Sequence, residues 1–205
     1  MSSVLVFGGT FDPVHNGHLA IAHQARVATA AEAVWFVPAA LAPLRDPPEA
    51  TPEERFELLE AACDDWGGPD LATLDIAIRR GGISYTAEVM DALRAEHPDL
   101  DLAVLIGADA ARTISRWHRA EGLLRSERFV IVNRTGPPPL EPVEVSMLGF
   151  ADARTTLLTL DSPDISASEV RQRCARGESL DGLVPGVVAS LIAAKGMYRK
   201  NRDDA

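Results

Sequence analysis

Short apolar runs alternate with longer amphipathic segments along most of this chain. The apolar runs, several of them rich in β-branched residues, fall at residues 4–7, 34–37, 71–78, 102–106, 129–132 and 156–160. Between them, helical spacing of apolar positions predicts helices over residues 18–30, 52–65 and 85–97, and shorter helical pieces over 110–126. This β-α-β-α order predicts an α/β fold, a Rossmann-like doubly wound parallel sheet with helices on both faces.

The pattern changes after residue 160, where two helical segments, 167–176 and 186–195, follow each other without an apolar run between them. Ser166 and Glu169 have the spacing of a capping box at the start of the first segment. A chain of 205 residues fits one domain. We expect a single domain over residues 1–205, with a Rossmann-like core over 1–160, a small C-terminal helical lobe over 161–198 and a polar tail over 199–205.

Composition and charge narrow the class of partners. The net charge of −10 argues against a general nucleic-acid surface, which is built from clustered Lys and Arg. No run approaches the ~20 apolar residues that cross a bilayer, and the N-terminus lacks a secretory leader. Cys63 and Cys174 have neither metal nor redox spacing, so we expect reduced thiols and a cytoplasmic protein. The sequence leaves open a homo-oligomer.

The segment over residues 8–18, GGTFDPVHNGH, follows the first apolar run directly. Parallel strands end in this way at phosphate-binding loops, where backbone amides and a helix start offer donors to an anion. Gly8 and Gly9 can adopt positive φ and let a ligand approach the backbone. We expect Asp12 to orient this loop more than to perform acid–base chemistry.

Two histidines in the same segment, His15 and His18, lie three positions apart where a helix should begin. On a first helical turn, this spacing directs both imidazoles to one side, toward anything bound at the helix N-terminus. The same pair could instead be an ordinary helix cap in a surface loop. The glycines before the pair favour a nucleotide site with two protonatable donors.

These residues also resemble a known family. Residues 8–18 are similar to the nucleotidylyltransferase signature, with its HxGH core at residues 15–18, and residues 165–171 (ISASEVR) are similar to the second signature of that group. Between and beyond them lie GGISYT, IGAD, Trp117 and LVP, at residues 81–86, 106–109, 117 and 183–185. Over nearly the full chain this set resembles the bacterial nicotinate-nucleotide adenylyltransferases.

The resemblance implies a reaction and an ATP site. The reaction is transfer of the adenylyl group of ATP to nicotinate mononucleotide, giving nicotinate adenine dinucleotide and pyrophosphate in NAD biosynthesis. His15, His18 and Arg171 would be catalytic, and Mg²⁺ would bind the ATP phosphates without protein ligands. Ser166 and Arg171 would hold the β- and γ-phosphates, although a plain helix cap and a solvated arginine have the same pattern. The implied ATP site consists of Gly8, Gly9, Thr10, Phe11, His15, His18, Gly107, Asp109, Ile165, Ser166 and Arg171.

For the mononucleotide, the resemblance implies Arg45, Thr86, Trp117 and Arg134. Trp117 would stack on the pyridine ring and Thr86 would contact its carboxylate; the residues alone would equally suit a packing tryptophan and a helix cap. Asp109 could likewise be a cap rather than a ribose ligand. The loop over residues 38–45 departs from the family pattern PxNxPPHK, because it carries Ala40 and Leu44 at the asparagine and histidine positions. Only Arg45 remains there as a phosphate anchor.

Other functions stay open at this point. A sister adenylyltransferase could use nicotinamide mononucleotide or pantetheine phosphate. The nicotinamide acceptor stays open because Ala40 stands where the family pattern has an asparagine. A class I aminoacyl-tRNA synthetase shares a related histidine motif, but the chain is short and lacks a KMSKS-like lysine motif. A non-catalytic nucleotide sensor with this fold would be expected to have lost a phosphate contact, and His15, His18, Ser166 and Arg171 are all present.

Overall fold

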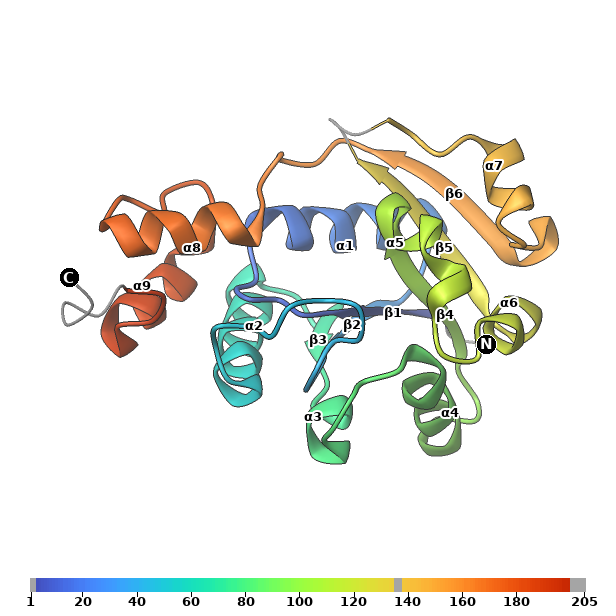
Figure 1. Ribbon diagram of the computed structural model, residues 1–205, viewed down its shortest axis with the longest axis horizontal. Coiled ribbons are helices and arrows are strands. Elements are labelled where there is room, and N and C mark those ends of the chain that lie inside the picture. Colours follow the sequence, from blue (N-terminus) through green and yellow to red (C-terminus); the bar gives the residue numbers. More distant parts are fainter. Residues whose placement is uncertain (1–2, 135–137, 200–205) are drawn as a thin grey trace.

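The computed structural model describes residues 3–134 and 138–199. Within them, a six-stranded sheet has the order β3-β2-β1-β4-β5-β6, and each neighbouring pair is parallel (Figure 1). The strands are β1 (Ser3–Gly9), β2 (Ala33–Pro38), β3 (Leu71–Thr73), β4 (Asp101–Gly107), β5 (Arg128–Arg134) and β6 (Thr155–Leu160). The predicted α/β, Rossmann-like sheet is confirmed.

Helices cover both faces of this sheet (Figure 1). They are α1 (Asn16–Thr29), α2 (Pro52–Trp66), α3 (Ile76–Arg80), α4 (Thr86–Glu96), α5 (Ala108–Arg112), α6 (Ala120–Ser126), α7 (Pro142–Met147), α8 (Ala167–Arg176) and α9 (Gly186–Lys195), with short 3-10 turns at Ile114–Arg116 and Asp152–Arg154. Alternate strand residues enter opposite cores, as strand geometry requires. Leu5 packs with α1, α2, α8 and α9, whereas Val4 and Val6 pack with α3 to α7.

The strand order reverses between β1 and β4, and this reversal positions the candidate site. From β1 the chain proceeds outward through β2 and β3, and from β4 it proceeds the other way through β5 and β6. In such sheets, a crevice opens beyond the C-terminal ends of the two central strands. Gly9 ends β1 and Gly107 ends β4, so both glycine-containing motifs lie at this crevice.

The strand predicted over residues 71–78 is wrong in its second half. The apolar run over residues 71–78 forms a strand only at β3, and α3 begins at Ile76. Ile76 and Ala77 are buried in the core on the α4 side of the sheet. Asp75 accepts a hydrogen bond from Arg79 Nε at 2.8 Å, four residues on, which is the spacing of neighbours on a helix surface. A short buried helix therefore replaces the second half of the run.

The C-terminal helices pack on the same core as α1 and α2. Val170, Val188 and Ile192 belong to one buried cluster with Leu19 and Leu58. In Figure 1, α8 and α9 lie together at one end of the molecule, beside α2. The division of the domain at residue 160 stays a prediction, and the tail beyond residue 199 lies outside the described residues.

Candidate active site

The loop between β1 and α1 opens the site. Neither Gly8 nor Gly9 uses the positive φ that is open to glycine, because β1 continues in extended conformation through both. The left-handed residue is Phe11, with φ of 51°. Gly9 is needed for space, since a Cβ there would lie 2.8 Å from the Phe11 ring. A Cβ at Gly8 would meet no atom within 4 Å, so this end of β1 is open to a ligand.

His15 and His18 lie side by side at the start of α1. His15 is the N-cap residue, and its backbone N–H donates to His18 Nδ1 at 3.3 Å. The imidazole rings stack with centroids 3.6 Å apart and planes 25° apart. Both rings therefore lie on one side of the helix start, as their spacing predicts. Among the described residues, His15 Nδ1 is buried without a hydrogen-bond partner, and it lies against Gly17, where an added Cβ would come within 3.1 Å of it.

The environment keeps both imidazoles neutral. Burial, with a smaller contribution from the charge of Arg134, lowers the pKa of His15 to about 4. The pKa of His18 is also lowered, by burial first and then by His15 and Arg134. At pH 7 each ring therefore carries one N–H to donate. A polyphosphate bound beside the rings would raise both pKa values, because an opposite charge favours the imidazolium form.

The second motif reaches the first across the site. Arg171, on α8, donates from Nη1 to the backbone carbonyl of Asp12 at 2.7 Å and from Nε to the Glu49 carboxylate at 2.7 Å. The chain before α8 also comes close to the start of α1 at Gly17. A Cβ at Gly17 would lie 3.1 Å from His15 Nδ1 and 3.2 Å from the Pro163 carbonyl. The segment that leads into α8 thus lies against the histidine turn.

Asp12 holds the loop in place, as expected. Its side chain is 4% exposed and accepts from the backbone N–H groups of Glu49 and Ala50 at 2.8 and 3.1 Å. The Tyr198 hydroxyl donates to the same carboxylate at 2.8 Å. Burial raises the pKa of Tyr198, and Asp12 raises it further, so the phenol stays protonated as a donor. One carboxylate therefore joins three segments of the chain.

Ser166 and Ile165 have separate roles at the start of α8. Ser166 is the N-cap, and its Oγ accepts from the Glu169 N–H at 3.1 Å. A capping box would also have the Glu169 side chain accept from the Ser166 N–H. Here the Glu169 carboxylate instead pairs with Arg173, at 3.5 Å from its Nε. The Ile165 side chain is buried in the core, so only its backbone can face a ligand.

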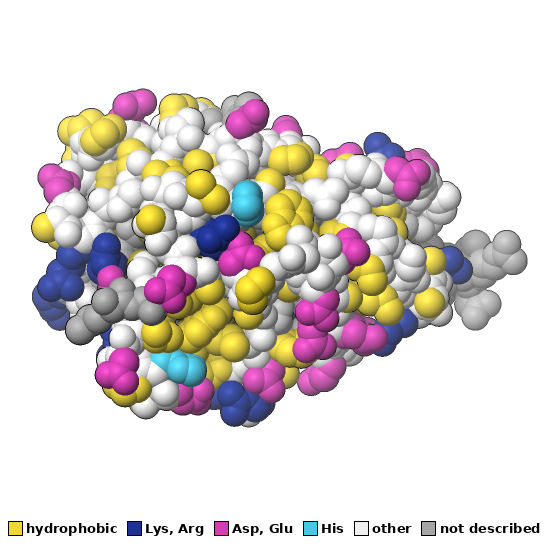
Figure 2. Space-filling view, turned by 180° about the vertical axis from the view of Figure 1, so that it is seen from behind, with side chains coloured by type: hydrophobic (Ala, Val, Ile, Leu, Met, Phe, Trp, Pro, Cys, Tyr) yellow, Lys and Arg dark blue, Asp and Glu magenta, His cyan; other side chains and the backbone are white. Residues whose placement is uncertain are grey.

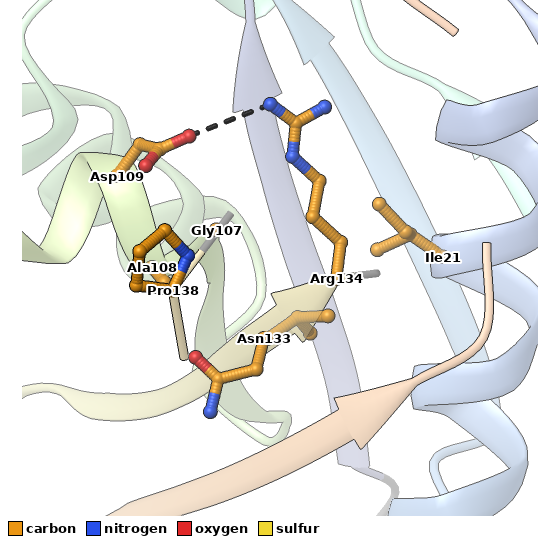
Figure 3. A pocket seen from close by; sticks show the side chains of 8 residues that line it. Ile21, Gly107, Ala108, Asp109, Asn133, Arg134 and Pro138 are labelled. Carbon is orange, nitrogen blue, oxygen red and sulfur yellow. Dashed lines mark hydrogen bonds and ion pairs between the residues drawn. The ribbon is translucent and has the colours of Figure 1, made fainter. Parts of the chain in front are cut away.

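Gly107 and Asp109 line a pocket at the end of β4. In Figure 3 the Arg134 side chain extends across this pocket to Asp109, with Ile21 of α1 on the other side. Arg134 Nη2 lies 3.5 Å from the Asp109 carboxylate. Sequence reasoning assigned Arg134 to the mononucleotide, and the structure places it beside the pair assigned to adenosine. A Cβ at Gly107 would meet no atom within 4 Å, so a ligand can approach here.

Thr86 and Trp117 lie near each other, because the residues next to them in the chain are in contact. Thr86 is the first residue of α4, and Trp117 follows the 3-10 turn after α5. Their neighbours Tyr85 and His118 have ring centroids 4.4 Å apart. Trp117 is half-buried and its Nε1 lies 3.4 Å from Thr113 Oγ1. Arg45 is exposed on the loop between β2 and α2, where no acidic partner is found for it within the described residues.

Two residues of this region were missed by sequence reasoning. Arg55, on α2, is fully buried and donates to backbone carbonyls of the loops around the site. It occupies the same helix stripe as Leu58, Leu59 and Ala62, and a cation on an otherwise apolar stripe was the available signal. Tyr198 gave none, because only the fold brings the chain end to Asp12.

The surface of the molecule mixes apolar and charged side chains. Figure 2 shows one face, on which histidine, basic and acidic side chains lie among gathered hydrophobic side chains. Across residues 3–134 and 138–199, no group of three His, Cys, Asp or Glu side chains could hold a metal ion, and no described helix is long and apolar enough to cross a membrane.

A doubly wound sheet with paired imidazoles and an opposing guanidinium at its strand-order reversal defines a nucleotide-binding α/β protein. Residues 6–173 match the cytidylyltransferase-like family. Similar curated proteins include two named probable nicotinate-nucleotide adenylyltransferase. The protein of Gemmatimonas aurantiaca is 32% identical, covering 95% of this chain and 92% of its own, and that of Stenotrophomonas maltophilia is 40% identical, covering 97% and 98%.

A solved structure has the same fold. Plasmodium falciparum nicotinic acid mononucleotide adenylyltransferase complexed with NaAD superposes with a TM-score of 0.77 over 97% of this chain and 98% of its own, at 15% identity. The chain belongs to the cytidylyltransferase-like family, and the resemblance indicated by its two motifs is confirmed.

Proposed function

We propose that this chain is an enzyme that transfers the adenylyl group of ATP to nicotinate mononucleotide, producing nicotinate adenine dinucleotide and pyrophosphate in NAD biosynthesis. The observation that carries the proposal is the meeting of the two motifs, with Arg171 on the Asp12 carbonyl beside the stacked His15 and His18. The relatives named for this activity cover the chain over nearly its full length.

The reaction needs positioning and charge stabilisation more than covalent chemistry. A phosphate oxygen of the mononucleotide attacks the α-phosphorus of ATP, the bond to the bridging oxygen breaks, and pyrophosphate leaves. His15 and His18 donate hydrogen bonds to α-phosphate oxygens, where negative charge builds in the transition state. Each neutral ring carries one N–H, which is the donor that this role requires.

The leaving pyrophosphate lies on the α8 side of the site. Arg171 would hold the β- and γ-phosphates together with Ser166 and the first backbone N–H groups of α8. Arg171 already reaches the loop after β1, so it requires only a local rearrangement to meet the phosphates. Gly8, Gly9, Thr10 and Phe11 supply the backbone beside the triphosphate, with Ile165 contributing through its backbone.

The two nucleosides would occupy opposite sides of the loop after β1. Gly107 and Asp109 suit adenosine, because the open backbone of Gly107 admits a ligand and a carboxylate accepts from ribose hydroxyls. Thr86 and Trp117 suit the pyridine ring and its carboxylate. Arg45 would bind the mononucleotide phosphate, and Arg134, beside Asp109, would act between the two substrates.

Mg²⁺ is proposed as a companion of ATP rather than a resident of the protein. The groups at the phosphate side of the site are imidazoles, backbone N–H groups and a guanidinium, which donate to phosphate oxygens and offer none of the oxygen ligands that Mg²⁺ prefers. Mg²⁺ therefore fits this site only on the nucleotide, where it neutralises phosphate charge. We also propose a cytoplasmic location, since Cys63 and Cys174 are both free, and no nucleic-acid partner.

Pyrophosphate release with a panel of acceptors tests the proposal. Purified protein with ATP and Mg²⁺ should release pyrophosphate with nicotinate mononucleotide at the highest kcat/KM. Nicotinamide mononucleotide is the second candidate, because the loop after β2 offers the apolar Ala40 and Leu44 where the family pattern has polar residues. Preference for nicotinamide mononucleotide or pantetheine phosphate would replace the proposed acceptor, and ATP binding without turnover on any acceptor would indicate a sensor.

A further inference from the structure

Arg55 is a buried cation whose partners are backbone carbonyls. Its side chain is 0% exposed. Nη1 donates to the Thr10 carbonyl at 2.6 Å, and Nη2 donates to the Ala39 and Ala40 carbonyls at 2.6 and 3.1 Å. Nε donates to the Ala50 carbonyl at 3.3 Å. Within the part of the chain that the structure describes, no carboxylate lies within ion-pair distance of this guanidinium.

Such a group is expensive to bury. Removing a guanidinium from water costs several kcal/mol unless hydrogen bonds and nearby opposite charge compensate. Four of its five N–H donors bind carbonyls. The buried Asp12 carboxylate supplies compensating charge, which opposes the lowering of the Arg55 pKa by burial. An apolar side chain at this helix position would leave the four carbonyls without this donor, so the guanidinium fixes the positions of the segments that carry them.

The carbonyls that Arg55 binds belong to two different substrate segments. Thr10 lies in the loop after β1, which faces the triphosphate in the proposed function, and Ala39 and Ala40 begin the loop after β2. That loop continues the connection, because the Ala40 N–H donates to Ser84 Oγ at 2.9 Å and the Ser84 N–H donates to the Leu41 carbonyl at 2.9 Å. Ser84 precedes Thr86, on the proposed mononucleotide side, by two residues.

We propose that Arg55 is a positioning residue that sets the separation of the two bound substrates by tying the ATP-side loop to the mononucleotide-side loop. The proposal rests on the adenylyl-transfer function proposed above. In an in-line transfer, the attacking phosphate oxygen must lie close to the α-phosphorus, and a misplacement of about 1 Å can cost ~100-fold in rate. Arg55 touches neither substrate and acts through the Thr10, Ala39 and Ala40 carbonyls.

Arg55→Lys tests this role. A lysine keeps the charge but places its donors on one atom, so it cannot reach both loops with the fixed fork of a guanidinium. We expect kcat at saturating substrates to fall ~10- to 100-fold, while the Kd for ATP alone and for the mononucleotide alone, measured by calorimetry, stays within about threefold of wild type. A purely structural role would not separate kcat from binding in this way.

Arg94→Lys is the matched control. Arg94 donates to the buried Glu127 carboxylate with both Nη atoms at 2.5 Å. Glu127 directly precedes β5, so it lies at the N-terminal ends of the strands, whereas the site lies at their C-terminal ends. This variant makes the same chemical change to a guanidinium with buried partners. It should lower the unfolding temperature and leave kcat unchanged. Ser84→Ala provides a second variant should Arg55→Lys fail to fold, because it removes only the side-chain link to Ala40.

The outcomes separate the two proposals. Ser84→Ala should lower kcat several-fold, and where Arg55→Lys folds, the double variant should lose less than the product of the single effects, since both residues act on one connection. Wild-type kcat in a folded Arg55→Lys, wild-type kcat in Ser84→Ala, or a loss confined to substrate Kd would overturn the positioning role while adenylyl transfer stands. An inactive wild-type protein would instead overturn the proposed function, and the positioning role with it.

Discussion

The guanidinium of Arg171 donates to the backbone carbonyl of Asp12 at 2.7 Å, although 159 positions separate these residues in the chain. The connection brings the last motif to the loop after β1, and the Pro163 carbonyl approaches Gly17 in the same region. Two distant segments of the chain therefore form one site. The start of α1 supplies the imidazoles, and α8 supplies the guanidinium.

Removing the Arg171 guanidinium should weaken the hold on the β- and γ-phosphates. We expect Arg171→Ala to raise the KM for ATP at least tenfold and to lower kcat/KM by on the order of 100-fold, because charge-assisted bonds to phosphate are lost. Steady-state kinetics with ATP varied measures this. Arg173→Ala is the control on the same helix, since Arg173 pairs with Glu169; an equal loss in both variants would contradict a specific role for Arg171.

Glu49 should compete with ATP for Arg171. Its carboxylate is exposed and accepts from Arg171 Nε at 2.7 Å, so a triphosphate must displace it. Exposed ion pairs contribute at most about 1 kcal/mol. We therefore expect Glu49→Gln to lower the KM for ATP by about two- to fivefold, measured beside Glu57→Gln, whose partner is Lys195. A KM that rises in Glu49→Gln would show that Glu49 assists binding instead.

Loss of the His18 imidazole should slow the chemical step. We expect His18→Ala to lower kcat by on the order of 100-fold, as removal of one preorganised donor does. His23→Ala is the matched control, because His23 lies on the same helix away from its N-terminus. Thermal unfolding of both variants checks that the fold survives. Turnover near the wild-type rate in His18→Ala would remove the histidine from the mechanism.

The buried His15 makes stability depend on pH. Its pKa is about 4 in the folded protein and close to 6.5 when unfolded. The unfolded chain therefore binds the proton first, and the contribution is complete above about pH 6.5 and is lost as the pH falls toward 4. His15→Asn removes this titration and keeps a good N-cap residue. In urea unfolding, the wild-type protein should lose about 2 kcal/mol more unfolding free energy than His15→Asn when the pH is lowered from 7 to 5. Equal losses in the two proteins would contradict the burial argument.

Trp117 should contribute to one substrate only. We expect Trp117→Ala to raise the KM for nicotinate mononucleotide about tenfold or more through loss of ring stacking, with the KM for ATP unchanged. Trp66→Ala, at the far end of α2, controls for removal of a large aromatic side chain. Equal increases in both KM values would show that Trp117 packs the core rather than the pyridine ring.

Periodicity made most of the fold predictable, because buried parallel strands and amphipathic helices leave distinct spacing in the sequence. The bounds predicted for α8 and α9 agree with the structure, whereas β1 extends two residues beyond the predicted run, through Gly8 and Gly9. Residues 76–78 were missed because a short apolar run gives the same signal for a strand and for a buried helix. The tertiary environment decided that helix.

The site was predictable where chemistry is local in sequence. His15 and His18 are neighbours on one turn, so their spacing already indicated that both rings point to one side; that the rings stack is seen only in the structure. Contacts made by folding were not accessible. The Tyr198 hydroxyl on Asp12 joins opposite ends of the chain, and Arg134 reaches Asp109 from an adjacent strand. Strand order brings β5 beside β4 and so Arg134 near Asp109, whereas the packing of α9 against α2 brings Tyr198 to Asp12.

A crystal structure with an unreactive ATP analogue and Mg²⁺ would test the convergence of the two motifs most directly. The account predicts an α-phosphate oxygen within hydrogen-bond distance of the His15 or His18 ring, and β- or γ-phosphate oxygens on the Arg171 guanidinium, with Glu49 displaced. Phosphates that contact only one of these two motifs, or that lie outside the space between them, would contradict it.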